Sequence, residues 1–195
     1  TMGYVTIVRF RSIGPQTPDP DTPAYGPDNA KVAVIEFFDY QCVFCSRFAP
    51  ELEKVMKAQP DVRYLFKEWP IFGGRWEASL QAAQQGLTVW QKKGPQAYVT
   101  YHNAIYATGH NEGKLTAEDI HGAASKAGLT TPAPGDHTAS LEKNSNLAEA
   151  LGLTGTPGII VMPVSGATPD TITVFPEAVT AEKLQAAIRK ATRVK

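Results

Sequence analysis

The sequence predicts a mixed α/β fold in which a helical segment interrupts a small sheet. Three observations indicate it: a strand, a helix and a strand follow one another over residues 31–68, only helical patterns occupy residues 75–151, and strand, strand and helix return over residues 158–192. A strand–helix–strand unit implies a parallel pair of strands joined by a right-handed crossover. The helical segment therefore separates two halves of one domain.

The chain begins with a predicted strand that is set apart from the rest. Residues 4–10 are β-branched and aromatic, which is typical of a strand. Residues 14–27 contain five prolines and predict an extended linker, because proline is incompatible with a helix interior and donates no backbone hydrogen bond. Such a tethered strand has two plausible positions: on the edge of its own domain, or paired with a second chain.

The first half of the main domain is a βαβ unit. Residues 31–39 form an apolar run that predicts a buried strand, and residues 61–68 alternate as a second strand. Between them, residues 42–57 predict a helix with apolar side chains along one side, namely Phe48, Leu52, Val55 and Met56.

Four helices and a second half follow. The first two helices are predicted over residues 75–92 and 95–107, the second of them with a proline at a favourable first position. Thr116 caps a third helix that ends before Gly128, and a fourth covers residues 137–151. The closing elements are strands at 158–162 and 171–175, and a helix at 181–192 capped by Thr180.

Composition excludes several classes of function. Nineteen basic and nineteen acidic residues cancel, so neither a nucleic-acid groove nor a polybasic membrane patch is expected. No apolar run approaches the ~20 residues of a membrane span. With 43% hydrophobic residues the chain has enough apolar material for a core.

The only two cysteines of the chain form a CxxC motif at a strand-to-helix junction. Cys42 and Cys45 follow the apolar strand directly and open the next helix. Free backbone N–H groups and the helix dipole stabilise a thiolate at such a position, and the spacing lets the two sulfurs form a disulfide with each other. We therefore predict a redox-active dithiol in which Cys42 is the exposed nucleophile and Cys45 is shielded and resolves the mixed disulfide.

Two structural readings of the cysteines compete with this prediction. A disulfide across two residues closes a very short loop and constrains the chain little. A zinc site needs two further ligands, and the four histidines fall in the helical segment without paired metal-ligand spacing: His102, His110, His121 and His137. Neither reading accounts for the motif as well as redox chemistry does.

Three motifs together resemble the DsbA-like thiol–disulfide oxidoreductases and the catalytic domains of the DsbC/DsbG-like isomerases. They are residues 34–45 with the CxxC, residues 66–70 (Phe-Lys-Glu-Trp-Pro) and residues 151–157, which end in Thr-Pro. The resemblance covers about residues 28–192 and implies the thioredoxin fold with an inserted all-helical domain. The dipeptide between the cysteines, Val43-Phe44, departs from the best-known variants, which leaves the redox potential open.

The resemblance also implies a domain division. Residues 1–27 form an N-terminal strand with a Pro-rich linker, a candidate dimerisation arm. Residues 28–72 and 155–195 form the catalytic thioredoxin-fold domain, and residues 73–154 form the helical insertion. Isomerases of this group carry a substantial N-terminal dimerisation domain, and here a strand plus a Pro-rich linker could still mediate dimerisation, for example by exchange.

Substrate contacts are expected near the CxxC. By resemblance, Pro157 is a cis-proline facing the motif, and the backbone of Thr156 pairs with an extended substrate segment. A threonine before this proline is common among isomerase-type members. Val43 and Phe44 belong to an apolar surface suited to unfolded polypeptides. The alternatives are an ordinary trans proline opening a strand and aromatic residues that are simply core.

Two charged residues lie close to the motif in the predicted sheet. Glu36 is a carboxylate within the apolar strand before Cys42 and could relay a proton to or from Cys45. Lys67, at the end of the neighbouring strand, could pair with Glu36. A structural ion pair with no part in turnover is the alternative.

The sequence thus predicts a cofactor-free catalyst of protein thiol–disulfide exchange. We favour a disulfide isomerase, working as a homodimer on unfolded or misoxidised polypeptides in the bacterial periplasm, with an export signal absent from this chain. The redox partner protein is not identified, and no nucleic acid or membrane insertion is expected. The alternatives are a monomeric DsbA-like oxidase and, from other classes, a module binding a soft metal such as Cu(I) through two thiolates or a non-catalytic holdase.

Overall fold

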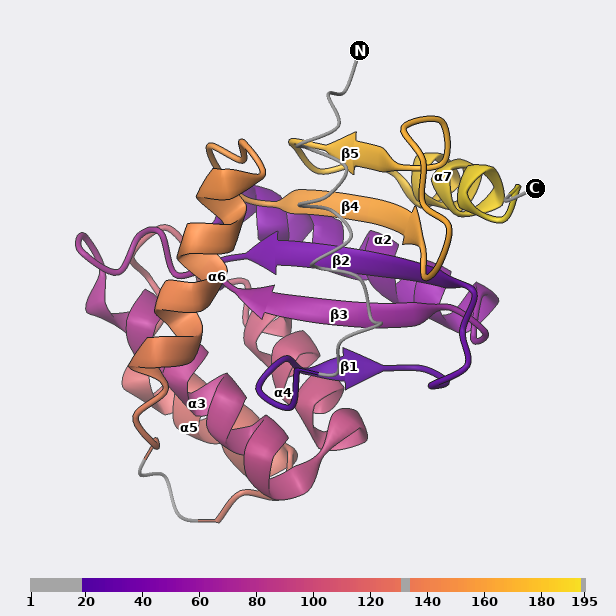
Figure 1. Ribbon diagram of the computed structural model, residues 1–195. Helices are drawn as coiled ribbons and strands as arrows, with labels where there is room; N and C mark the ends of the chain where they lie inside the picture. The colour runs from indigo at the N-terminus through magenta and orange to yellow at the C-terminus, as the bar shows by residue number, and fades with distance from the viewer. Residues whose placement is uncertain (1–18, 131–133, 194–195) are drawn as a thin grey trace.

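A five-stranded sheet forms the centre of the molecule. The computed structural model describes residues 19–130 and 134–193, and its strands lie in the order β1–β3–β2–β4–β5 (Figure 1). The central strands β2 (Val32–Phe38) and β3 (Arg63–Glu68) are parallel, as predicted, and are joined by α2 (Val43–Ala58). The other strands run antiparallel to their neighbours: β1 (Ala24–Tyr25) beside β3, β4 (Gly158–Pro163) beside β2, and β5 (Thr173–Phe175) beside β4.

All four helices predicted between the two halves are present within the described residues. They are α3 (Glu77–Lys93), α4 (Pro95–Ala107), α5 (Ala117–Lys126) and α6 (Thr138–Ala150), and α7 (Ala181–Ala191) follows the last strand. The predicted fold class, two sheet-forming halves separated by helices, is therefore confirmed.

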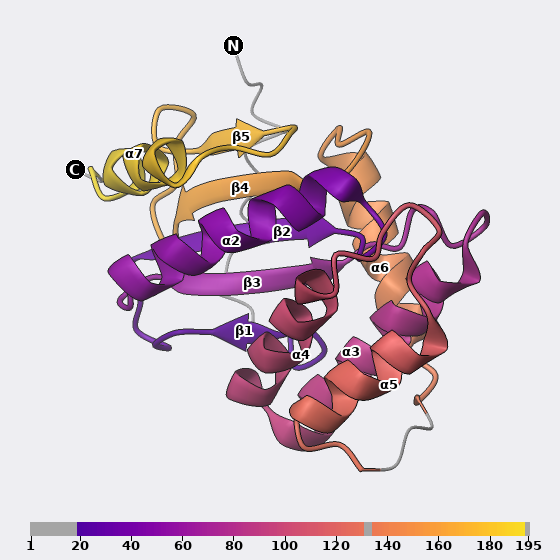
Figure 2. The same ribbon diagram turned by 180° about the vertical axis from the view of Figure 1, so that it is seen from behind.

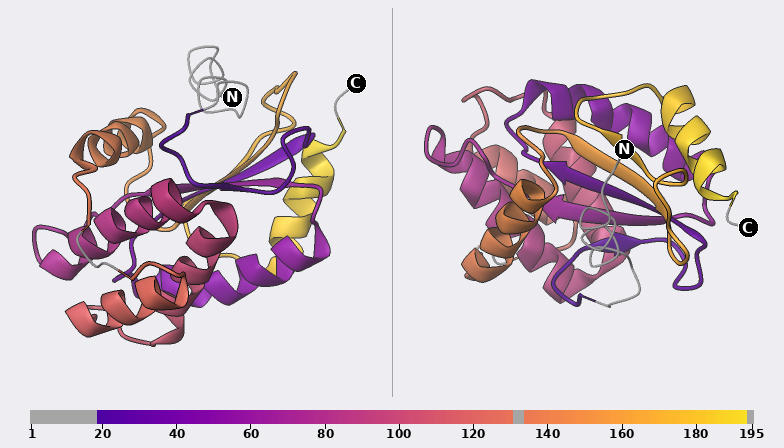
Figure 3. Two further views of the ribbon diagram at one scale, coloured as in Figure 1. Left: turned by 90° about the horizontal axis from the view of Figure 1, so that it is seen from below. Right: turned by 45° about the horizontal axis from the view of Figure 1, so that its top comes forward.

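Helices cover both faces of the sheet. Figures 1 and 2 show α6 in front of the sheet and α2 behind it, and the view from below in Figure 3 places α2 and α7 together on the side opposite α6. Because side chains alternate along a strand, β2 contributes Val34 and Phe38 to the core under α2 and α7, and Ile35 and Phe37 to the core under α6. Every residue of β2 is buried as a result.

The helical segment contributes to both of these cores, in addition to a small cluster of its own formed by Ala83, Leu87 and Leu141. Tyr98 and Ile105 of α4 belong to the same cluster as Phe38 and Phe66 of the sheet, while Ala148 of α6 belongs to the cluster on the opposite face. A division of the chain at residues 73 and 154 stays a prediction.

The segment before β2 differs from its prediction. The strand predicted at residues 4–10 lies outside the described residues, as does the first part of the linker. Residues 19–27 are not a free linker, because Ala24 and Tyr25 pair with β3 and the amide of Phe66 donates to the carbonyl of Pro23. A proline-rich stretch is compatible with this position because an edge strand needs hydrogen bonds on one side only.

Candidate active site

The turn between β2 and α2 is held by a buried aspartate. The Asp39 carboxylate accepts hydrogen bonds from the Gln41 amide (2.8 Å), the Phe72 amide (2.9 Å) and the Ser79 hydroxyl (2.8 Å). These donors come from the turn itself, the loop after β3 and α3, so Asp39 ties three segments together. Burial raises the pKa of Asp39, and the hydrogen bonds that it accepts oppose that rise.

The CxxC motif occupies the N-terminus of α2. Cys42 is the N-cap residue, and its sulfur accepts a hydrogen bond from the amide of Cys45 at 3.4 Å. The helix forms here because Phe48, Leu52 and Val55 follow at helical spacing and bury one side of it. The two sulfurs are both free.

The two thiols have opposite acidities. A hydrogen bond from the Cys45 thiol lowers the pKa of Cys42 to about 6 against the effect of burial, with further contributions from Thr156 and the amides of Cys45 and Phe44. Burial is the main cause that raises the pKa of Cys45 well above its usual value, and the Cys42 sulfur and the Glu36 carboxylate add to it. One sulfur is thus ionised near neutral pH while the other keeps its proton.

The burial of the two sulfurs only partly follows the prediction. Cys45 is fully buried, as expected. The prediction that Cys42 is exposed is wrong, because that residue is only 3% exposed. The reason is tertiary: the Cys42 sulfur lies 3.4 Å from the carbonyl oxygen of Thr156, so the loop before β4 closes over the helix end. The Thr156–Pro157 peptide bond is cis, and Pro157 is buried beside this contact.

Glu36 lies beneath the site in the core shared with the helices. It is 1% exposed, and neither of its carboxylate oxygens has a hydrogen-bond partner among the described residues. The nearest charged partner is His102 of α4, whose Nε2 lies 3.7 Å from Oε2 of Glu36. His102 is itself enclosed by aromatic rings: Phe38, Tyr40, Phe66, Tyr98 and Tyr106.

The predicted partnership of Lys67 with Glu36 is wrong. Glu36 is opposite Phe66 in the register of β2 and β3, so the neighbouring residue Lys67 points to the other face of the sheet. There its ammonium donates to the Thr22 hydroxyl at 2.6 Å and lies 3.7 Å from the carboxylate of Asp19. Lys67 therefore anchors the segment before β2 and does not belong to the dithiol site.

Two features near the dithiol were missed from the sequence. Glu68, also buried, accepts hydrogen bonds from the hydroxyls of Tyr40 (2.9 Å) and Tyr98 (2.7 Å), and burial raises its pKa well above the usual value. Glu112, in the loop between α4 and α5, accepts a hydrogen bond at 3.1 Å from the amide of Val43 at the start of α2. A turn signal at Asn-Glu-Gly marks that loop, but nothing local indicates what it contacts.

Of the two residues between the cysteines, Phe44 is the more exposed. Its ring is 54% exposed and carries the guanidinium of Arg47 at 5.5 Å from its centre. Ile71, in the loop that contacts Asp39, is the next exposed apolar side chain near this end of the sheet. Val43 is half-buried.

Two kinds of feature are absent from the described residues. None of the helices there combines the length and the apolar character that crossing a membrane requires. No group of three or more histidine, cysteine, aspartate or glutamate residues is placed to hold a metal ion within residues 19–130 and 134–193.

Comparisons with known proteins show the family to which the chain belongs. The thioredoxin family model matches residues 18–190, which is most of the chain. Disulfide bond formation protein D of Bacillus subtilis is 32% identical over 88 residues, a match that covers 43% of this chain and only 38% of that protein. The chain thus spans well under half the length of that curated relative.

Two solved structures from Salmonella enterica Typhimurium are similar over nearly the whole chain. BcfH shares 38% identity with a TM-score of 0.80, over 96% of this chain and 80% of the other. A periplasmic thioredoxin-like protein shares 26% identity with a TM-score of 0.75, over 98% and 99% of the two chains. With the CxxC at the start of α2 and the matching fold, the chain belongs to the thioredoxin family, as a thiol–disulfide oxidoreductase.

Proposed function

We propose that this protein is a disulfide isomerase that rearranges wrong disulfides in unfolded or misoxidised polypeptides. The observation that supports it most is the pKa of about 6 at Cys42. Strongly oxidising dithiols have a nucleophilic cysteine with a pKa of about 3.5, whereas the pKa in reducing ones is about 7. An intermediate value keeps the Cys42 thiolate populated for attack, while the disulfide is less oxidising than that of a strong oxidase.

The reaction begins with the Cys42 thiolate. It attacks one sulfur of a substrate disulfide, forming a mixed disulfide at Cys42 and releasing the other substrate sulfur as a thiolate. That thiolate attacks another disulfide of the substrate, and a substrate thiolate finally displaces Cys42 from the mixed disulfide. Bonds made and broken balance, and no net oxidation or reduction of protein or substrate takes place.

Cys45 releases substrates that fail to rearrange. Its thiolate attacks the Cys42 sulfur, which forms the Cys42–Cys45 disulfide and frees a reduced substrate. Because the pKa of Cys45 is raised, its proton must be taken up at that moment. We assign this step to the Glu36 carboxylate, which lies close enough to act electrostatically on Cys45 and has no competing hydrogen bond among the described residues. His102, at 3.7 Å, is the partner that can share the proton.

Substrate is held by the loop before β4 and by the start of α2. The Thr156 carbonyl already contacts the Cys42 sulfur, so an extended segment pairing with the Thr156 backbone would bring a substrate sulfur to Cys42. The exposed ring of Phe44, with Val43, supplies apolar contact. We place this activity in the bacterial periplasm, where disulfides persist; the similarity to a periplasmic thioredoxin-like protein supports this location.

Refolding of a scrambled, multiply disulfide-bonded enzyme tests the proposal. In glutathione buffer, wild-type protein should restore activity, whereas Cys42→Ala should not. Rapid oxidation of the reduced enzyme without recovery of the scrambled form would replace the isomerase with a DsbA-like oxidase. Stoichiometric copper binding without turnover, or an effect that survives Cys42→Ala, would point to a metal-binding module or a holdase.

Dimerisation through residues 1–27 is a separate part of the proposal. Isomerases benefit from two sites facing one cleft, and the predicted strand at residues 4–10 is the segment that would join two copies. Sedimentation of the full chain against a variant lacking residues 1–16 tests it. A dimer that persists in the truncated variant would contradict strand exchange.

A further inference from the structure

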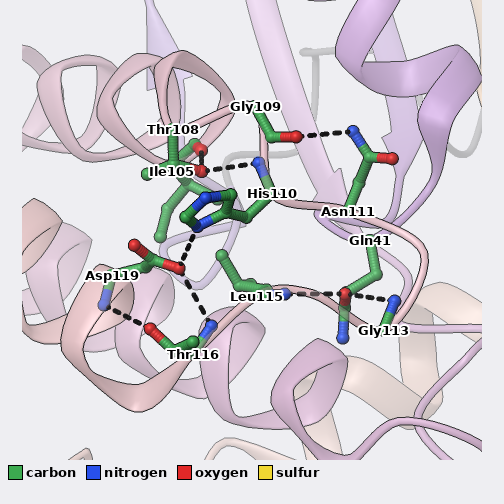
Figure 4. A network of polar contacts seen from close by, with 10 residues as sticks. All are labelled: Gln41, Ile105, Thr108, Gly109, His110, Asn111, Gly113, Leu115, Thr116 and Asp119. Carbon is green, nitrogen blue, oxygen red and sulfur yellow. Dashed lines mark hydrogen bonds and ion pairs between the residues drawn. The ribbon is translucent and has the colours of Figure 1, made fainter.

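The loop between α4 and α5 lies across the start of the active-site helix. Gln41, directly before Cys42 and only 1% exposed, holds it in place. Its side-chain oxygen accepts from the amides of Gly113 (2.8 Å) and Leu115 (3.3 Å), and its backbone carbonyl accepts from the amide of Glu112 (2.9 Å). Figure 4 shows Gln41 pointing into this loop.

A second set of contacts holds the far side of the same loop. The Asp119 carboxylate accepts from the amide of Thr116 (3.0 Å) and lies 2.8 Å from Nδ1 of His110 (Figure 4). Thr116 in turn caps α5 by accepting from the amide of Asp119. With both sides fixed, the position of Glu112 between them is set by the fold.

Glu112 adopts a backbone conformation that non-glycine residues rarely take. Its φ is +52°, and it is the one non-glycine residue with positive φ among the described residues. Such conformations persist where the surroundings impose them, and they cluster at functional sites. In this conformation the Glu112 side chain reaches the amide of Val43.

Three of the four N–H groups at the start of α2 donate to groups that can carry a negative charge, and the fourth donates to a backbone carbonyl. The amide of Cys42 donates to the carbonyl of Asp39, and that of Val43 donates to the Glu112 carboxylate. The amides of Phe44 and Cys45 donate to the Cys42 sulfur. All four orphan donors of the helix are therefore used, and a carboxylate shares the positive end of the helix dipole with the thiolate.

We propose that Glu112 tunes the redox equilibrium of the dithiol, because its negative charge at the start of α2 disfavours the reduced form that carries the Cys42 thiolate. The disulfide form carries no charge at Cys42 and is not penalised. Glu112 therefore makes the site less oxidising than the same helix end would be without it. This inference depends on the thiol–disulfide exchange proposed above. It adds a residue that shifts the equilibrium between the dithiol and the disulfide of Cys42 and Cys45.

Other charged groups surround Cys42, and they differ from Glu112 in position. Glu36 and Asp39 are buried beneath the site, and Asp39 is close enough to Glu112 for the two charges to interact. The guanidinium of Arg47, on α2 itself, is stacked on Phe44. Glu112 is the exposed carboxylate that hydrogen-bonds the helix end directly, so its charge can be removed without disturbing the core.

The equilibrium with glutathione measures the effect. Reduced protein and one glutathione disulfide give the Cys42–Cys45 disulfide and two glutathione thiols. For an exposed charge that hydrogen-bonds the amide of Val43, the residue next to Cys42, Glu112→Gln should lower the equilibrium constant for oxidation about threefold to tenfold at low salt. That range corresponds to a potential higher by about 14 to 30 mV for a two-electron couple.

Glu112→Gln is the main variant because its amide oxygen still accepts from Val43 while the charge is gone. The matched control is Glu118→Gln, which removes an exposed carboxylate from the first turn of α5, where it does not bond to α2. We expect a lowered oxidation constant and a lowered Cys42 titration midpoint for Glu112→Gln, smaller at high salt, and wild-type values for Glu118→Gln.

An equilibrium constant of Glu112→Gln equal to that of wild type, with an unchanged melting temperature, would overturn the inference. So would equal shifts in both variants, since these would reflect net charge alone. A wild-type protein that forms no Cys42–Cys45 disulfide would overturn the proposed function as well. A normal disulfide equilibrium without isomerase activity would remove the isomerase proposal and leave the role of Glu112 standing.

Discussion

Removing the Cys45 thiol should weaken the acidity of Cys42 more than any other single change at the site. A hydrogen bond from that thiol is the largest cause of the low Cys42 pKa of about 6. A hydrogen bond to a charged group is worth about 1.5–3 kcal/mol, so its loss in Cys45→Ala should move the Cys42 midpoint to about 7–8. The thiolate fraction at pH 7 would fall from about 90% to about 10–50%.

The ultraviolet absorbance of the thiolate, followed against pH on reduced protein, measures this midpoint. In wild type the low-pH step belongs to Cys42, because the pKa of Cys45 is raised well above its usual value. Alkylation rates with iodoacetamide across the same pH range give an independent reading. Cys45→Ser is the matched control, since its hydroxyl keeps a donor at the same position and should hold the midpoint close to the wild-type value.

A Cys45→Ala variant that still titrates near the wild-type midpoint would refute the reasoning. The thiolate would then be held by the amides at the start of α2 and the helix dipole alone. A raised midpoint in both variants would instead show that the size of the buried side chain, and not its donor, controls the site.

Three further predictions follow from the same contacts. The Cys42 pKa falls from 9.0 in the unfolded reference to about 6 in the fold, so the reduced protein should gain about 2 to 3 kcal/mol of stability between pH 5 and pH 8 relative to Cys42→Ala. A stability that changes equally with pH in both proteins, measured by urea unfolding, would contradict this. Lys67→Met should leave the rate of disulfide exchange unchanged, because its ammonium lies on the sheet face opposite the dithiol; a slower rate would return Lys67 to the site. Tyr98→Phe removes one of two hydroxyls that donate to the buried Glu68 and should cost about 1–3 kcal/mol, measured by thermal unfolding, and an unaffected melting temperature would argue against that contact.

Local sequence patterns determined the elements that carry the dithiol. The apolar run at residues 31–39 is buried along its whole described strand, and the CxxC opens the next helix where the prediction placed it. The parallel pairing of β2 and β3 follows from the short βαβ spacing. These features depend on interactions between residues that are close in sequence, so they can be predicted from the sequence alone.

Only the tertiary structure decided what surrounds the dithiol. Cys42 is covered by the loop carrying Thr156, which is more than one hundred residues away in sequence. Lys67 points away from Glu36 because the parallel register of β2 and β3 places these two residues on opposite faces of the sheet. The sequence of either strand alone does not determine that register. His102 and Glu112 reach the site from the helical segment through long-range packing. Local propensity therefore determines which residues begin the helix, whereas loop closure and packing between distant elements determine the charges and hydrogen bonds that those residues meet.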